Sequence, residues 1–421
     1  MSALEKYIEG LTRKAKEAAH ALSQAPTSVK NRALLAMADS LGKRASVILA
    51  ANARDVAAAR RRGVKGALLD RLILNRKRIE EMAIGLREVA KLPDPVGRVI
   101  SSWQRPNGLK IAKVRVPIGV IGIIYEARPN VTADCAGLCI KSGNSVILRG
   151  GSEAILSNRA IFRLLESAGA KAGLPAAALQ LVWNTDRRSV NLLLGTPGGV
   201  DLVIPRGGEG LIRQVVAKAK VPVIKQYKGI CHTFVDASAD LEKARRICTN
   251  AKVHRPGVCN AMETLLVHRQ AAPIFLPRMA ETYRAAGVRL RGDSESRQIL
   301  RGTPVEAATA EDWDTEYLDL ILSVKVVGSL EEAMEHIRRH GSGHSDAIVT
   351  RSKANAARFL KGVDSACVYV NASTRFTDGG QFGLGAEIGV STDKLHARGP
   401  MGLEELTTYK YEIRGTGQVR K

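Results

Sequence analysis

Aromatic residues are scarce in this sequence: phenylalanine, tryptophan and tyrosine make up 4% of its 421 residues. Alanine, valine, leucine and isoleucine must therefore fill most of the interior, as in the buried aliphatic strands of α/β proteins. A chain of this length exceeds what one hydrophobic core usually serves, so we expect two or three domains. No segment approaches the roughly 18 uninterrupted apolar residues of a membrane helix. The polar N-terminus is also unlike a signal peptide, which favours a soluble, cytoplasmic protein with no membrane partner.

Cysteine is sparse as well, and no two cysteines stand at C-x2-C spacing. That pattern excludes a disulfide scaffold and indicates reduced thiols. Cys135 and Cys139 stand one helical turn apart, which is typical of small buried core residues. The remaining cysteines are Cys231, Cys248, Cys259 and Cys367.

Acidic residues are outnumbered, because 41 Asp and Glu face 64 Lys and Arg and the net charge is +23. A charge of this sign attracts anionic partners, nucleic acids included. The basic runs are short and scattered, however, and they are not interleaved with the aromatic residues that stacking on bases requires. We therefore expect solvated helix faces and no nucleic-acid partner.

The first part of the chain has a helical pattern. Apolar positions recur at helical spacing in residues 4–23. Thr27 or Ser28 is the expected cap of a second helix, and further helices continue to about Val89.

After a proline-rich break at 91–97, the pattern becomes strand-like. Two such runs flank Pro106-Asn107-Gly108 and predict a hairpin, which is a candidate oligomer arm. From Gly119 strands and helices alternate, so we expect parallel, doubly wound sheets in two α/β units with the ligand site between them. The predicted strands are 120–126, 144–150, 179–183, 200–208, 221–226, 232–236, 263–268, 319–327, 346–350 and 366–371.

The dinucleotide fingerprint G-x-G-x-x-G is absent after the first strand. Two other glycine turns follow strands and precede helices: Arg149-Gly150-Gly151-Ser152 and Arg206-Gly207-Gly208-Glu209-Gly210. Backbone N–H groups at a helix N-terminus bind phosphate. The two turns together favour a nucleotide phosphate, although glycine is also common in ordinary strand-to-helix turns.

The stretch "VHRPGVCNAMETLLVH", 253–268, places Cys259 after a Pro-Gly pair. His254 and His268 stand at irregular distances from this cysteine, so we expect no metal site. The turn can hold the thiol in a crevice, where it could attack a carbonyl or acyl carbon. Free cysteines are often simply buried, and the residues alone therefore leave nucleophile and core thiol open.

Three segments carry a resemblance to one family: 117–154 with "YEARPNVT", 253–268 with "HRPGVCNA", and 382–411. They are similar to the gamma-glutamyl phosphate reductases of the aldehyde dehydrogenase superfamily, and the resemblance covers essentially the whole chain. It implies an α/β fold of the aldehyde dehydrogenase type and a homo-oligomer. The implied parts are a Rossmann-type cofactor domain (1–96 and 119–227), a catalytic α/β domain (228–402), and a small β oligomerisation arm and tail (97–118 and 403–421).

The resemblance also implies a reaction in which Cys259 is the nucleophile and Asn130 donates to the developing oxyanion. The thiolate attacks L-glutamyl 5-phosphate, phosphate leaves, and hydride from NADPH reduces the thioester to L-glutamate 5-semialdehyde, the second step of proline synthesis from glutamate. Hydrolytic members carry a glutamate before a Gly-Gly pair as the base that activates water. This chain has "KQYKG" at 225–229 instead. An enzyme that releases phosphate needs no activated water, so the missing base agrees with this reaction.

The choice of NADPH depends on the turn after the second strand of the alternating series. In the superfamily the residue matching Arg149 lies near the adenosine ribose, and Ser152 stands where NAD-preferring members often have an acid. Arg149 is therefore expected to pair with a 2′-phosphate, and Gly207 and Gly208 are further cofactor-binding positions. The alternative is that Arg149 only caps a turn while Glu153 balances its charge.

The substrate carries a phosphate and an α-carboxylate, which require forked cations. Arg128, Arg255 and Arg375 are the candidates, each close to one of the motifs. His344 in "GSGHSD" is expected either to contact the substrate or to cap a loop.

Two other functions agree with parts of the sequence. A thioester-forming aldehyde dehydrogenase that uses coenzyme A also lacks the hydrolytic base. A basic scaffold or nucleic-acid-binding protein on an inactive dehydrogenase fold is disfavoured, because Cys259 and Asn130 are both present. The labile acyl phosphate suggests handover from glutamate 5-kinase as a partner.

Overall fold

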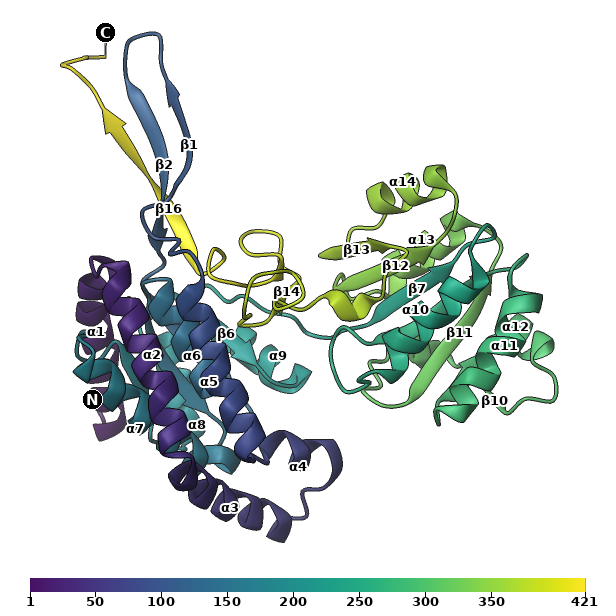
Figure 1. The fold of residues 1–421 in the computed structure, drawn as a ribbon, viewed down its shortest axis with the longest axis horizontal. Helices are drawn as coiled ribbons and strands as arrows, with labels where there is room; N and C mark the ends of the chain where they lie inside the picture. The colour runs from purple at the N-terminus through teal and green to yellow at the C-terminus, as the bar shows by residue number, and fades with distance from the viewer. Residues whose placement is uncertain (421) are drawn as a thin grey trace. The chain divides into compact units, whose positions relative to one another are not determined.

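The computed structural model describes residues 1–420, apart from the side chain of Ala67. It divides into two compact α/β units (Figure 1). The sequence places the boundary between the cofactor and catalytic domains two residues later than this division does, and it assigns 383–389 to the catalytic domain. Among the described residues no helix is both long and apolar enough to cross a membrane. Unit 1 comprises Met1–Lys225, Gly383–Gly389 and the chain from Met401, and unit 2 comprises Gln226–Phe382 and Val390–Pro400.

Helices form the first part of unit 1, as the apolar spacing predicts. The first helix begins with a capping box, in which Ser2 and Glu5 side chains each accept from the other's backbone N–H. The second helix begins at Thr27, but its N-cap is Pro26 and no side chain caps it. The predicted cap at Thr27 or Ser28 is wrong, because the Thr27 hydroxyl donates to Asp94 instead (2.8 Å). The helices are α1 (Ala3–Ser23), α2 (Thr27–Lys43), α3 (Ala45–Arg61), α4 (Gly66–Leu72) and α5 (Arg76–Lys91).

A four-stranded parallel sheet in the order β5-β4-β3-β6 forms the centre of unit 1. Buried aliphatic residues such as Ile8, Ile124 and Leu193 pack α1, α8 and α9 against one face of it. The predicted strand at 221–226 is wrong, because this segment makes a single bridge, from Val223 to Val203. The elements are β3 (Val120–Tyr125), α6 (Val131–Lys141), β4 (Ser145–Gly150), η1 (Ser152–Ala154), α7 (Ile155–Lys171), β5 (Leu179–Leu181), α8 (Arg187–Gly195), β6 (Leu202–Arg206) and α9 (Glu209–Lys218).

The predicted hairpin is present and carries a third strand from the C-terminal tail. β1 (Val99–Gln104) and β2 (Lys110–Pro117) pair antiparallel, and β16 (Thr407–Arg414) pairs with the other edge of β2. Gly108 in the turn has a φ of 89°, which glycine adopts without strain. Figure 1 shows the three strands projecting from the helices of unit 1.

Unit 2 contains a seven-stranded parallel sheet in the order β10-β9-β11-β8-β7-β12-β13. Neighbouring residues of β7 point to opposite faces, since Phe234 packs with α13 and α14 while Val235 packs with α10 and α11. Helices on both faces confirm a doubly wound sheet. The short elements β9, β10 and α12 were not predicted.

The strands of this sheet are β7 (Cys231–Val235), β8 (Met262–His268), β9 (Arg289–Gly292), β10 (Val305–Ala307), β11 (Ile321–Val327), β12 (Ser345–Val349) and β13 (Cys367–Val370). The helices are α10 (Leu241–Val253), α11 (Ala272–Ala285), α12 (Ser294–Ile299), η2 (Ala310–Asp314), α13 (Leu330–His340), α14 (Lys353–Gly362) and η3 (Thr374–Phe376). A separate two-stranded sheet pairs β14 (Val390–Ser391) with β15 (Gly399–Pro400).

Candidate active site

Cys259 lies in the loop between the end of α10 and the start of β8 in unit 2. It is half-buried, whereas the other five cysteines are buried and, like it, free of disulfides. Its carbonyl oxygen accepts a hydrogen bond from the Cys231 thiol (3.2 Å). Burial raises the pKa of the Cys135, Cys139, Cys231 and Cys248 thiols above the ordinary value, which keeps them protonated and unreactive. Exposure therefore distinguishes Cys259 as the reactive candidate.

Gly229 supports the backbone of Cys259 from a neighbouring segment. A Cβ atom at Gly229 would lie 2.0 Å from the Cys259 carbonyl oxygen and 2.6 Å from its Cα, so only glycine fits there. The Gly229 N–H donates to Glu316 Oε1 (2.9 Å). The stretch "KQYKG" thus has a packing function that sequence reasoning missed, since it considered only the base that the stretch lacks.

Asn260 joins the Cys259 loop to η3 and the residue after it by hydrogen bonds. Its Nδ2 atom donates to the Thr377 carbonyl (2.8 Å), and its carbonyl accepts from the Thr374 hydroxyl (2.7 Å). Its Oδ1 atom accepts from Arg375 Nη1. Burial is the main cause that lowers the pKa of Arg375, and the positive charge of Arg255 lowers it further. The neighbouring Asp378 and Cys259 oppose this shift. Unit 2 therefore brings Cys259 together with two predicted arginines.

His344 is fully buried and immediately precedes β12. Its Nδ1 atom lies 2.8 Å from the Ser345 hydroxyl and 3.7 Å from the Cys231 sulfur. Ser345 in turn contacts the Thr377 hydroxyl (2.6 Å). His344 belongs to the packing that supports the Cys259 loop.

Asn130 stands at the N-cap of α6 in unit 1. Its Nδ2 atom donates to Asp134 Oδ2 (2.8 Å), one helical turn away. Burial raises the pKa of Asp134 to about 6, and the bond from Asn130 and the charge of Arg206 oppose the shift. An asparagine amide has two N–H groups, so one is held by Asp134 and the other can donate to a ligand. Sequence reasoning missed Asp134, although its i+4 spacing from Asn130 was a usable signal.

Arg128 lies in the turn between β3 and α6, where it is half-buried. The turn is held by Glu153, whose Oε1 atom accepts from the Ala127 N–H (2.6 Å). Ala127 has a φ of 40°, an unfavourable value for a residue with a side chain. This strain and its compensating carboxylate fix the path of the chain between Arg128 and Asn130.

Arg149 is the penultimate residue of β4, and Ser152, in the turn that follows, is exposed. Arg149 donates from Nη1 to the Gly150 carbonyl (3.1 Å) and from Nη2 to the Thr185 carbonyl (3.0 Å). Its Nε atom is buried and makes no hydrogen bond within residues 1–420. Burial lowers the pKa of Arg149, and the charge of Glu153 opposes this. The unsatisfied donor fits a site for an anionic group, and the two backbone bonds fit the turn-capping alternative.

The turn after β6 is in contact with the carboxylate of Glu126, the residue that follows β3. The Gly208 N–H donates to Glu126 Oε2 (3.0 Å). A Cβ atom at Gly207 would lie 2.4 Å from the same oxygen. The amide at the N-terminus of α9 is thus paired with a carboxylate, and a cofactor phosphate at Gly208 requires Glu126 to move.

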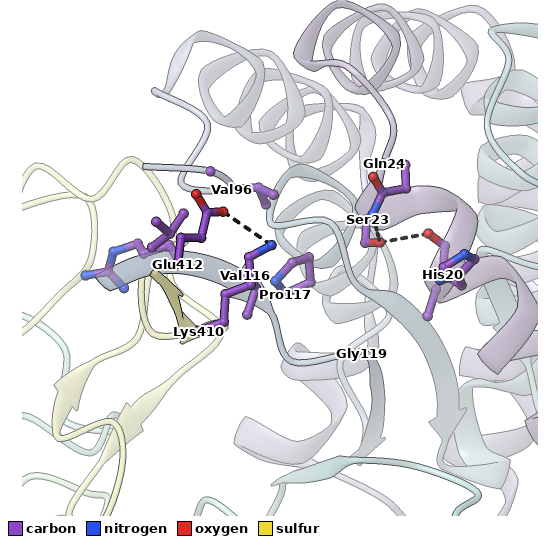
Figure 2. Close-up of a pocket in the computed structure, with 13 residues that line it drawn as sticks. His20, Ser23, Gln24, Val96, Val116, Pro117, Gly119, Lys410 and Glu412 are labelled. Atoms are coloured by element: carbon purple, nitrogen blue, oxygen red, sulfur yellow. Dashed lines mark hydrogen bonds and ion pairs between the residues drawn. The ribbon is translucent and has the colours of Figure 1, made fainter. Parts of the chain in front are cut away.

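A separate hollow of about 380 Å³ opens in unit 1 beside β2, β16 and the end of α1 (Figure 2). Lys410 and Glu412 line it and form an ion pair at 3.3 Å. None of the predicted site residues lines this hollow. We therefore do not assign the predicted chemistry to it.

Comparisons with known proteins show the family to which the chain belongs. The model of the aldehyde dehydrogenase family matches residues 2–311, and the chain belongs to this family of oxidoreductases. A solved acetylating aldehyde dehydrogenase from Geobacillus thermoglucosidasius shares the fold, with a TM-score of 0.69 at 16% identity, 99% of this chain and 98% of that chain being covered.

Within the family the chain groups with the gamma-glutamyl phosphate reductases. The protein of that name from Moorella thermoacetica is 60% identical over 419 residues, which cover 100% of this chain and 99% of the relative. The crystal structure of gamma-glutamyl phosphate reductase from Thermotoga maritima matches with a TM-score of 0.95 at 51% identity, and 98% of this chain and 100% of that chain are covered. The resemblance inferred from the motifs and the aldehyde dehydrogenase type of fold are confirmed.

Proposed function

We propose that this protein reduces L-glutamyl 5-phosphate to L-glutamate 5-semialdehyde and phosphate with NADPH, the second step of proline synthesis from glutamate. The observation that carries the proposal is the half-buried Cys259, whose backbone is packed against Gly229. Gly229 ends the stretch "KQYKG", 225–229, which stands where hydrolytic relatives carry the water-activating glutamate. The names of the relatives with 51% and 60% identity support the same substrate.

Cys259 acts as the nucleophile in this proposal. Its thiolate attacks the γ-acyl carbon, the C–O bond to phosphate breaks, and a glutamyl thioester forms. The bound nicotinamide supplies the hydride that reduces the thioester carbon. Asn130 and the Cys259 N–H stabilise the negative oxygen, and breakage of the C–S bond then releases the semialdehyde and regenerates the Cys259 thiolate.

Arg149 and Ser152 are the residues that we assign to the cofactor's 2′-phosphate. The unsatisfied Nε atom of Arg149 and the absence of an acid at position 152 support NADPH over NADH. Gly207 and Gly208 are assigned to the cofactor as well, with Glu126 displaced.

Arg255 and Arg375 are assigned to the two anionic groups of the substrate, because Arg255 lies in the Cys259 loop and Arg375 donates to Asn260, the residue after Cys259. Arg128 is a third candidate, in the turn that leads to Asn130. We assign His344 to support of the loop, because its side chain is fully buried.

The domain functions follow the same proposal. Residues 1–96 and 119–227 bind the cofactor, 228–402 carry the nucleophile, and 97–118 with 403–421 form the arm of a homo-oligomer. The exposed Trp103 and Tyr411 rings lie on β1 and β16, the two strands that flank β2, with their centroids 6.1 Å apart edge to face. They offer an apolar surface for another copy. Sedimentation of wild type and Trp103→Ala measures whether the arm holds an oligomer, and co-sedimentation at physiological salt tests glutamate 5-kinase as a partner.

The reaction is tested in the reverse direction, with semialdehyde, phosphate and either NADP⁺ or NAD⁺. We expect reduction of NADP⁺ that requires phosphate, and a loss of more than about 10⁴-fold in Cys259→Ala with an unchanged melting temperature. Activity with coenzyme A in place of phosphate would assign the acylating alternative instead. Full activity of Cys259→Ala, or no turnover by folded enzyme with either acceptor, contradicts the proposal.

A further inference from the structure

A buried ion pair closes the base of the loop that carries Cys259. Lys252 lies in the last turn of α10 and Glu263 is the second residue of β8, so the loop 254–261 runs between them. Lys252 Nζ and Glu263 Oε2 are 2.6 Å apart, and neither side chain is exposed to solvent. The pair therefore joins the two ends of the loop.

The same pair contacts the segment 316–318. Glu263 Oε1 accepts from the Leu318 N–H (3.2 Å), and Lys252 Nζ lies 5.8 Å from the centroid of the Tyr317 ring. Leu318 has a φ of 54°, which is unfavourable for a residue with a side chain. The hydrogen bond that the Leu318 N–H donates to Glu263 compensates for this conformation.

The segment 316–318 leads back to the nucleophile. Glu316, two residues before Leu318, accepts from the Gly229 N–H (2.9 Å). Gly229 lies against the Cys259 backbone with no room for a Cβ atom. The contacts thus form a continuous series from the ion pair, through Leu318, Glu316 and Gly229, to the backbone of Cys259.

Joining a helix to a strand by a buried ion pair requires the desolvation of two charges, which costs free energy. Burial lowers the pKa of Lys252 and raises that of Glu263 to about 7, and each partner opposes the other's shift. Apolar residues of similar volume often stabilise a fold equally well. A charged hydrogen bond differs from apolar packing because it fixes both the distance and the direction of its two groups.

We propose that Lys252 and Glu263 are positioning residues, whose ion pair holds the Cys259 backbone where its thiol and N–H act on the acyl carbon. The proposal rests on the proposed function, in which Cys259 is the nucleophile. Neither residue touches the substrate, because both are fully buried.

The test uses the double variant Lys252→Met/Glu263→Gln, which removes both charges and keeps an acceptor for the Leu318 N–H. We expect kcat to fall about 10- to 100-fold, with KM for semialdehyde and phosphate changed less than about threefold. Hydrogen exchange measured by mass spectrometry should be faster in 254–261, at a melting temperature within about 5 °C of wild type. Glu263→Gln alone gives the same two readouts if the double variant does not fold.

The matched control is a buried lysine–carboxylate pair in unit 1, Lys30 with Asp94, whose N···O distance is also 2.6 Å. Lys30→Met/Asp94→Asn should change the melting temperature and leave both kcat and exchange in 254–261 at wild-type values. Wild-type kcat and exchange in folded Lys252→Met/Glu263→Gln overturn the positioning role. Absence of turnover in the wild type contradicts the proposed function instead, and the exchange comparison then still decides the role of the pair.

Discussion

The turns of unit 1 and the Cys259 loop of unit 2 are both held by carboxylates, but in different ways. In unit 1, Glu126 accepts from the Gly208 N–H and Glu153 from the Ala127 N–H. These are backbone amides of the kind that bind a ligand phosphate. In unit 2, Glu263 and Glu316 fix segments that pack around Cys259, which stays half-buried. We therefore expect changes in the turns to alter cofactor binding and changes around the loop to lower kcat.

Asn130 is the expected exception in unit 1, because the proposed mechanism assigns it to the reacting oxygen. Asn130→Ala should lower kcat by about 10²- to 10³-fold, since it removes one oxyanion donor. Steady-state kinetics with saturating semialdehyde and phosphate measures this loss. The melting temperature serves as control, and a wild-type kcat would remove Asn130 from the site.

Gly229→Ala tests the Cys259 loop most directly. The added Cβ atom would lie 2.0 Å from the Cys259 carbonyl oxygen, so the loop must shift, and we expect kcat to fall by about 10²-fold. Gly195→Ala is the matched control, because no atom lies within 4 Å of a Cβ atom built there. Equal kinetics for the two variants would show that the packing of Gly229 does not position Cys259.

Arg149→Ala tests the turn after β4. We expect kcat/KM for NADP⁺ to fall by about tenfold or more, with that for NAD⁺ nearly unchanged, because a charged hydrogen bond to the 2′-phosphate is lost. Arg188→Ala, at an exposed arginine of α8 that pairs with Asp186, is the control. An equal fall with both cofactors would favour the alternative that Arg149 only caps the turn.

Asp134→Asn has the smallest expected effect and concerns stability. The folded-state pKa of about 6 lies above the ordinary value of 3.8, so the fold binds a proton more tightly than the unfolded chain does. Stability from this group therefore falls as pH rises from about 4 to about 6, and the loss is complete above that window. The amide carries no titrating proton, so the variant should be more stable by about 1–2 kcal/mol above pH 6, the gain being limited by partial exposure of the side chain. Thermal melts from pH 4 to 8 measure this, and parallel profiles for the two proteins would contradict the assignment.

Local pattern was sufficient for much of the fold. The helical spacing of 4–23, the hairpin at Gly108 and the alternation after Gly119 each depend on residues close in sequence. The failures occurred where contacts with distant residues overrode a local signal. The stretch 221–226 has strand composition but forms one bridge, and Thr27 has a capping side chain that a distant aspartate engages instead.

The site was predicted unevenly for the same reason. Cys259 and Asn130 stand in distinctive motifs, so the resemblance was sufficient to predict them as site residues. Gly229 is required only because Cys259, far along the chain, packs against it. Lys252 and Glu263 are ordinary charged residues in the sequence, and only the structure shows that they are buried as a pair.

The sequence by itself therefore determined the family, the parallel sheets and the cysteine that carries the proposed chemistry, because motifs and periodicity are local properties of the chain. The tertiary structure decided which groups hold that cysteine in place. Burial, hydrogen-bond distance and the space left beside a glycine arise only when distant segments pack together. The ion pair of Lys252 with Glu263, 11 residues apart, and the bond from Gly229 to Glu316, 87 residues apart, are such properties.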